Sequence, residues 1–555
     1  FSCASPSVKP VKEVKEPPPQ AYYEYILGYE AELSGDWEDA LKHYQEVLRL
    51  DPLSSYLKTQ ISSIYLRTGR IQEAITTAEE VIKVEPDYVP ALMLLAQMYN
   101  SQKRLDEAIT MYERVIALDP SMSDAYLFLG VLYASKQRYE DSVKTLETLI
   151  KAKPDNAIAL YYLGVIHMDS KEYKKAEAAF TQVIELRPTF EPAYFNLGVI
   201  HEMNEELAEA ERYYKKASEL NPHETRARER LGQIYIKQKS VDKAIGQLRE
   251  ITDQNPSNID VHLRLGLLYL DEKNYDRAIE EFRIVIEAKP ADALPRFYLS
   301  LAFEEMEKYN EALEELKKVI SLDPKNITAF LHIGLIYSKL KNYHDAVGIY
   351  EEVLSFEKEK PEIYLYLAMT FIQMKEYTKA EDTFKTGLSV SKDNEELNFN
   401  LAVLYEKLHR YDDMTVYLKK VITLNPKHAD ALNFLGYSYA DRGINLEEAF
   451  SLIQRAAELK PDNGYILDSL GWIYFKLGKA SDAVFYLQKA ADIVKDDPTI
   501  YEHIGDVYFA QEKKESALKA WEKALEFSDK NDGEEGLKER VEEKIRNVKS
   551  NVPAR

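Results

Sequence analysis

Histidine is the residue type whose spacing in this chain first suggests chemistry. His167 and His201, two of ten histidines, are 34 residues apart. Two imidazoles held close together can bind a metal ion. However, no H-E-x-x-H sequence, cysteine cluster or glycine-rich phosphate loop accompanies them. The sequence therefore suggests no reaction, and we expect a non-enzymatic protein with no cofactor and no metal.

The charge balance restricts the class of partner. The 555 residues include 72 Lys and Arg against 94 Asp and Glu, a net charge of −22. Such a surface repels nucleic acid and anionic membranes. No stretch approaches the roughly 18 consecutive apolar residues that a membrane-spanning helix needs. We therefore expect a protein or peptide segment as the partner, with no nucleic acid and no small-molecule substrate.

Prolines recur at a fixed interval and divide most of the chain into units of equal length. With each proline at position 32 of a 34-residue repeat, fifteen repeats fill residues 21–531, with one inserted residue near Ile444. Position 8 is Gly, Ala or Ser in every repeat, and position 20 is Ala in thirteen. Chance does not produce such a series. The regular prolines are Pro52, Pro86, Pro120, Pro154, Pro188, Pro222, Pro256, Pro290 and Pro324, and Pro426 lies three periods further on.

The repeat also explains the spacing of the two histidines. Both occupy position 11, and Tyr fills that position in ten other repeats. A side chain that replaces a packing residue needs no ligand. We therefore interpret His167 and His201 as core substitutes rather than as metal ligands.

Each repeat predicts two helices. Apolar residues recur at helical spacing before and after a polar break such as residues 34–36, and proline ends the second helix because it has no N–H to donate. Small residues at positions 8 and 20 allow the two helices to approach closely. The pattern resembles the tetratricopeptide repeat (TPR) over about nine-tenths of the chain. In one repeat it is matched by Leu197, Gly198, Ala210, Tyr214, Ala217 and Pro222.

This resemblance implies an all-α, right-handed superhelical solenoid. Its concave groove would be lined by the first helix of each repeat, because such repeats bury their apolar faces only by stacking. Residues 532–555 lie beyond the last repeat, and there Leu537, Val541, Ile545 and Val548 form an apolar stripe. We expect this segment to be a capping helix with a short tail.

The first twenty residues precede the repeats. Residues 1–5 resemble the end of a bacterial lipobox with Cys3 as the acylated residue, and Ala4 resembles the outer-membrane sorting residue. The prolines that follow, among Lys and Glu, are typical of a semi-extended tether. The alternative is an ordinary tail with an idle cysteine.

Positions 5 and 9 of the first helices are expected to face the groove. From repeat 4 to repeat 12 they are apolar everywhere except in repeat 7, and their aromatic members are Tyr161, Phe195, Phe297 and Phe399. A large apolar surface usually marks a partner site, although packing inside a tightly wound superhelix is an equal alternative. No repeat has the Lys and Asn pair of a carboxylate clamp at these positions. An asparagine ladder is also absent, because position 6 is Asn only at Asn196 and Asn400.

Two stretches of the expected groove differ from the rest. In repeat 7, Arg226, Arg230 and Lys237 belong to a segment with seven Lys and Arg against four Asp and Glu. These cations could bind an acidic group of a partner or form a solvated face. Toward the C-terminus, Tyr437 and Trp472 occupy position 9 of consecutive repeats, with Asp468 beside them. We expect Trp472 to face the groove.

Residues 433–443 and 468–472 resemble a signature of bacterial envelope repeat proteins, particularly lipoproteins. The resemblance implies a scaffold held by Cys3 at the periplasmic side of an outer membrane, binding a segment of an envelope or secretion-complex protein. A cytoplasmic location is the alternative. Two other functions remain open: a structural role in exopolysaccharide synthesis or export, and a substrate-selecting subunit of a glycosyltransferase or protease complex.

The regular pattern weakens in repeats 10 and 11. Lys358 and Lys392 replace proline at position 32, and Gly387 replaces the packing residue at position 27. Both changes remove expected constraints at the boundaries between repeats. We therefore expect the array to be least stiff around residues 355–395.

Overall fold

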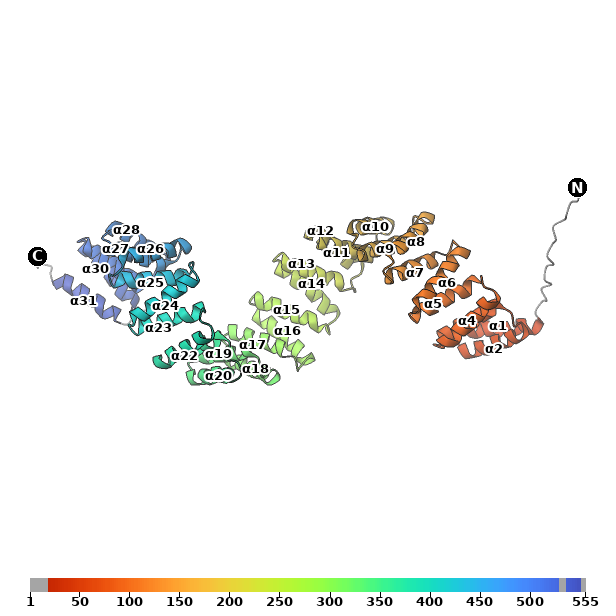
Figure 1. Ribbon diagram of the computed structural model, residues 1–555, viewed down its shortest axis with the longest axis horizontal. Coiled ribbons are helices and arrows are strands. Elements are labelled where there is room, and N and C mark those ends of the chain that lie inside the picture. Colours follow the sequence, from red (N-terminus) through yellow and green to blue (C-terminus); the bar gives the residue numbers. More distant parts are fainter. Residues whose placement is uncertain (1–17, 529–535, 551–555) are drawn as a thin grey trace. The chain divides into compact units, whose positions relative to one another are not determined.

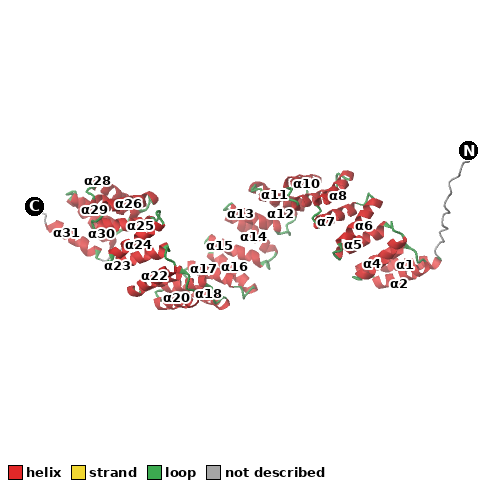
Figure 2. Ribbon diagram, viewed as in Figure 1, coloured by secondary structure: helices red, strands yellow, loops and turns green. Residues whose placement is uncertain are grey.

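The computed structural model describes residues 18–528 and 536–550, and the regular elements of those residues are all α-helices (Figure 1). Figure 2 shows them joined by short loops. Cys3 and most of the expected tether lie outside the described residues. The chain divides into two compact blocks, residues 1–261 and 262–555, which we call the N-terminal block and the C-terminal block. No helix of the described part combines the length and apolar character needed to cross a membrane.

The N-terminal block contains the helices of the first seven repeats. They are α1 (Pro19–Ser34), α2 (Trp37–Leu50), α3 (Ser55–Arg67), α4 (Ile71–Val84), α5 (Val89–Ser101), α6 (Leu105–Leu118), α7 (Ser123–Ser135), α8 (Tyr139–Ala152), α9 (Ala157–Asp169), α10 (Tyr173–Leu186), α11 (Glu191–Met203), α12 (Leu207–Leu220), α13 (Arg226–Lys237) and α14 (Val241–Gln254). The boundary between the blocks falls inside α15 (Ile259–Asp271).

The C-terminal block contains the remaining repeats and one further helix. Its helices after α15 are α16 (Tyr275–Ala288), α17 (Ala293–Glu305), α18 (Tyr309–Leu322), α19 (Ile327–Lys339), α20 (Tyr343–Phe356), α21 (Pro361–Gln373), α22 (Tyr377–Val390), α23 (Glu395–Lys407), α24 (Tyr411–Leu424), α25 (Ala429–Asp441), α26 (Leu446–Leu459), α27 (Gly464–Lys476), α28 (Ala480–Ile493), α29 (Pro498–Ala510), α30 (Lys514–Ser528) and α31 (Leu537–Ser550). The prediction of two helices per repeat is therefore confirmed.

Small residues at position 8 bring the two helices of a repeat together. A Cβ added to Gly198 would lie 2.6 Å from the ring of Tyr214, and one added to Gly164 would lie 2.6 Å from the ring of Phe180. Real Cβ atoms do not approach so closely. The large residue at position 24 of the second helix therefore fills the space that position 8 leaves open.

A left-handed residue at position 15 ends the first helix of every repeat. This residue is Gly35 in repeat 1 (φ 79°), whereas repeat 5 has Lys171 and repeat 6 has Glu205, both with φ 62°. The next residue donates its N–H back to the carbonyl of position 11, as Glu206 does to His201 at 2.9 Å. Such a bond satisfies a carbonyl at the end of the helix. The turn thus has one geometry whether or not glycine is present.

The two ends of the array differ in how their packing faces are covered. Position 3 of the first helix is buried in later repeats, and Leu57 is only 2% exposed, but Tyr23 in repeat 1 is 60% exposed. At the other end α31 packs on α30, with its apolar stripe buried against Trp521 and its neighbours. The stripe consists of Leu537, Val541, Ile545 and Val548.

The packing around Gly387 contradicts our interpretation of that residue. A Cβ at Gly387 would lie 2.7 Å from the Cβ of Tyr364 and 3.0 Å from Leu397. The Tyr364 hydroxyl also donates to the carbonyl of Lys358 at 3.1 Å. Gly387 therefore allows close contact between helices instead of leaving a packing position empty.

Candidate functional site

The aromatic residues at position 5 pack between consecutive repeats. Each is half-buried. Tyr161 accepts a hydrogen bond from Asn196 of the next repeat at 3.4 Å, and its ring centroid lies 5.7 Å from that of Phe180. Phe297 meets His332 of the next repeat edge-on at 5.5 Å. Position 5 therefore contributes mainly to the contact between repeats.

Phe195 and Phe399 are also packed against other aromatic rings. The Phe195 centroid lies 5.6 Å from that of Tyr214, in the second helix of its own repeat. Phe399 lies 6.1 Å from Phe434 of the next repeat, again with an edge-on geometry. The alternative of superhelix packing thus accounts for these side chains.

Position 9 is the more open half of the apolar stripe. In the C-terminal block it runs through five consecutive repeats, where the side chains are half-buried or exposed and Met369 reaches 42% exposure. Because packing within the array leaves part of each side chain in contact with solvent, these residues form an apolar row that a partner can cover. We call this row the position-9 row; it consists of Leu267, Leu301, Leu335, Met369 and Val403.

The basic residues of repeat 7 are exposed and partly neutralised within the chain. Arg226 pairs with Glu224 at 3.1 Å, and its guanidinium lies 4.8 Å from the centroid of the Phe195 ring. Arg230 lies 3.5 Å from a carboxylate oxygen of Glu202. Lys237 has no carboxylate partner among the described residues. Of the three predicted cations, Lys237 is therefore the one with an uncompensated charge.

Trp472 is buried, contrary to the expectation that it faces an open groove. Its side chain is 7% exposed, its ring stacks on His503 at a centroid distance of 4.1 Å, and it lies 5.2 Å from Phe475. Tyr437 is half-buried, with its ring 6.3 Å from His503. Burial of the indole follows from the histidine of the next repeat, which covers one face of the ring.

His503 and Asp468 form a buried pair beside this indole. The Nδ1 atom of His503 lies 2.9 Å and 3.1 Å from the two carboxylate oxygens of Asp468. Burial alone lowers the pKa of His503, but the nearby carboxylates of Asp468, Asp506 and Glu502 more than offset that effect. The pKa of His503 is therefore raised above its ordinary value, which favours the imidazolium form.

The capping helix supplies the cations for the last acidic positions of the inner face. Arg540 donates to both carboxylate oxygens of Glu502 at 2.9 Å, and Lys544 donates to Glu502 and Asp506, each at 2.7 Å. Burial raises the pKa of Glu502, but the hydrogen bonds from Arg540 and Lys544 outweigh it and hold the pKa below its usual range. Glu502 and Asp506 occupy positions 5 and 9 of repeat 15.

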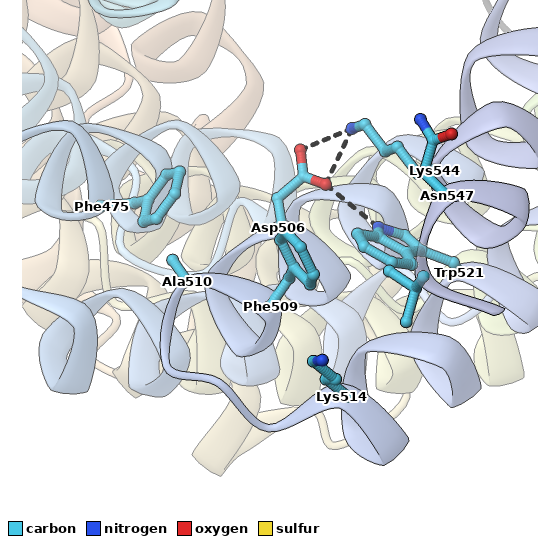
Figure 3. Close-up of a pocket in the computed structure, with 9 residues that line it drawn as sticks. Phe475, Asp506, Phe509, Ala510, Lys514, Trp521, Lys544 and Asn547 are labelled. Carbon is cyan, nitrogen blue, oxygen red and sulfur yellow. Dashed lines mark hydrogen bonds and ion pairs between the residues drawn. The ribbon is translucent and has the colours of Figure 1, made fainter. Parts of the chain in front are cut away.

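A pocket of about 420 Å³ opens beside these ion pairs, between α27, α29, α30 and α31 (Figure 3). Asp506 and Lys544 form its polar edge, and Asp506 also accepts a hydrogen bond from the indole of Trp521 at 3.0 Å. A smaller, polar pocket shares this edge and is lined by Tyr437, Trp472 and His503. Figure 3 shows the rings of Phe509 and Trp521 near the centre of the larger pocket. Its apolar lining consists of Phe475, Phe509, Ala510, Trp521 and Val548.

The sequence contains a signal for this pocket that we did not recognise among the repeat positions. Position 12 is aromatic only in repeats 14 and 15, where it is Phe475 and Phe509. Both line the pocket. The contacts of Arg540 and Lys544 had no such signal. Both residues belong to the capping helix, which is not part of any repeat, so the repeat pattern does not predict what they contact.

His167 and His201 are buried, as expected of core substitutes. The Nδ1 atom of His167 lies 2.8 Å from Glu172, and that of His201 lies 2.5 Å from Glu206. The residues that the structure describes contain no group of three metal-ligating side chains. Each imidazole is instead fixed by a glutamate of its own repeat.

Family models identify the repeated unit. Tetratricopeptide repeat models match residues 59–123, 99–163, 157–190, 192–224, 395–428, 465–496 and 498–531. A model of the tetratricopeptide repeat protein 21 C-terminal ARM domain matches residues 221–399. This chain belongs to the tetratricopeptide-repeat family. As a TPR protein it is a scaffold for protein–protein interaction, a role that is typically non-catalytic.

A relative and two solved structures resemble parts of this TPR chain. A TPR repeat-containing protein of Pseudomonas aeruginosa is 46% identical over 81 residues, which are 15% of this chain and 14% of that protein. A TPR protein from Parabacteroides merdae is 17% identical with a TM-score of 0.35, over 45% of this chain and 98% of that one. The MamA protein is 22% identical with a TM-score of 0.29, over 31% and 93%.

Proposed function

We propose that this TPR protein is a scaffold that binds a segment of an envelope or secretion-complex protein along the position-9 row. The observation that carries the proposal is the apolar row itself, open over five consecutive repeats of one block. Binding would come from burial of apolar side chains along a preformed surface. In the N-terminal block, Lys237 would offer a separate charge-assisted hydrogen bond to an acidic group of a partner.

Photo-crosslinking tests this surface directly. A photo-reactive phenylalanine analogue placed at Met369 should crosslink to a partner in native membranes. The same analogue at Val416, an exposed residue on α24, should not. Mass spectrometry of the crosslinked product identifies the partner. Equal crosslinking from both positions would place binding elsewhere than on the position-9 row.

We further propose that Cys3 carries lipid and holds the protein at the periplasmic side of an outer membrane. The supporting observation is the sequence of residues 1–5, with small residues around the cysteine. Each buried methylene of an acyl chain contributes about 0.8 kcal/mol, so two or three chains suffice to anchor a water-exposed array. Cys3→Ala in the full-length gene should move the protein from the membrane fraction to the supernatant. An unmodified Cys3 in the intact mass of the native protein would refute the anchor.

A further inference from the structure

The pocket beside α31 has aromatic walls that the repeat pattern does not require. In the two preceding repeats position 12 is Glu406 and Ala440, whereas repeats 14 and 15 place Phe475 and Phe509 there. Phe509 is 46% exposed, and its ring lies 5.6 Å from that of Trp521. A large aromatic side chain left so exposed is not explained by packing of the array. It is typical of a surface that a partner covers.

The pocket is large enough to hold a bulky side chain. Its volume of about 420 Å³ lies within the range of about 300–1,000 Å³ found for ligand sites. The indole of Trp521, which is almost fully buried, is fixed by its hydrogen bond to Asp506. A rigid, preformed wall lowers the entropic cost of binding, because its side chain does not have to be ordered when the ligand enters.

The charges around the pocket select the polar group of the ligand. Lys544 lies at the edge, but Glu502 and Asp506 already neutralise it. Lys514 lines the pocket, is exposed, and has no carboxylate partner among the described residues. The side-chain amide of Asn547 is a second donor on the lining, on the other side of Trp521 in Figure 3. The uncompensated charge of the pocket is therefore positive, and it complements a carboxylate.

The geometry points to the C-terminal residue of a partner polypeptide as the occupant, with a bulky apolar side chain in the pocket and the terminal carboxylate at Lys514. A terminal residue brings one carboxylate next to one apolar side chain. A segment with several acidic residues would be repelled by the net charge of −22. This inference rests on the proposed function and refines it, because it states how one end of the bound partner is held.

Fluorine NMR of the full chain labelled with 5-fluorotryptophan tests the pocket. The protein has three tryptophans, so Trp37→Phe and Trp472→Phe assign the Trp521 signal by elimination. The probe is the tripeptide N-acetyl-Ala-Ala-Phe with a free carboxylate, and its C-terminal amide is the matched control. The acid should shift the Trp521 signal and leave Trp37 unmoved, and the amide should bind at least fivefold more weakly.

Two variants separate the charge from the apolar contact. Lys514→Met should abolish the difference between acid and amide, whereas Lys519→Met, on the same helix, should preserve it. Phe509→Ala should weaken both ligands. Equal affinity for acid and amide, an unmoved Trp521 signal, or tighter binding of octanoate than of the tripeptide acid would overturn the inference. Crosslinking from Met369 reports on the position-9 row separately, so failure in the pocket is distinguishable from failure of the proposed function.

Discussion

At the scale of single residues, the repeat position of a side chain does not decide its environment. Met369 and Trp472 both occupy position 9, but Met369 is 42% exposed while Trp472 is enclosed by His503 and Phe475. The sequence pattern predicted which face of the helix each residue lies on. It could not predict what the next repeat places over that face, because the covering residue is not part of the period.

Substitution of Trp472 should therefore affect stability. Trp472→Ala leaves a cavity beside His503, and removal of a buried large aromatic side chain costs about 3–5 kcal/mol. Hydrogen exchange of the α27 amides should show that the free energy of local opening falls by about that amount. Tyr465→Ala, at an exposed site on the same helix, should stay within about 0.5 kcal/mol of the parent. Unchanged protection in α27 would mean that the indole is not part of the core.

The buried pair of His503 and Asp468 makes stability depend on pH. Because the folded state raises the pKa of His503 above its ordinary value of about 6.5, protonation favours folding. This stabilisation is complete below the ordinary pKa and is lost as the pH rises through the raised one. Asp468→Asn should therefore lower the melting temperature of the C-terminal block more at pH 6 than at pH 9. The exposed Asp482→Asn serves as the control, and a difference that stays constant with pH would contradict the assignment.

At the scale of elements, the turn at position 15 has backbone strain that the sequence pattern does not predict. A left-handed conformation costs roughly 1–2 kcal/mol for a residue with a side chain, and glycine loses about 0.5–1 kcal/mol of entropy instead. Glu205→Gly should therefore stabilise repeat 6 by about 0.5–1 kcal/mol, measured by hydrogen exchange in α11 and α12. Asn204→Gly, at the preceding residue with negative φ, should destabilise the same repeat. The opposite order of the two variants would show that the turn is relaxed.

Helices were easier to predict than their contacts. The 34-residue period and its prolines placed thirty helices in pairs, and the apolar stripe of residues 537–548 placed α31. The contact of Arg540 with Glu502 spans 38 residues and lies outside the 34-residue period, so the repeat pattern could not have indicated it. Gly387 shows the same limit. From the sequence, a glycine at a packing position predicts an unfilled space, whereas in the structure Tyr364 occupies that space.

At the scale of the whole molecule, repeats interact only with their neighbours, so a local change should stay local. Gly387→Ala would force a Cβ to 2.7 Å from that of Tyr364, and overpacking of this kind costs about 1–3 kcal/mol. Hydrogen exchange should accelerate across α21, α22 and α23 and remain unchanged across α27–α30, in the same block. Uniform acceleration across the block would show that its repeats open together.

The covered face of the last repeat also limits how copies of this protein can assemble. A repeat that leaves its packing face bare can accept the first helix of another copy, and such head-to-tail contacts propagate into filaments. Here α31 lies over α30, and its Arg540 and Lys544 are paired with Glu502 and Asp506. Stacking of a further copy on α30 would therefore require α31 to be displaced and those ion pairs to be broken.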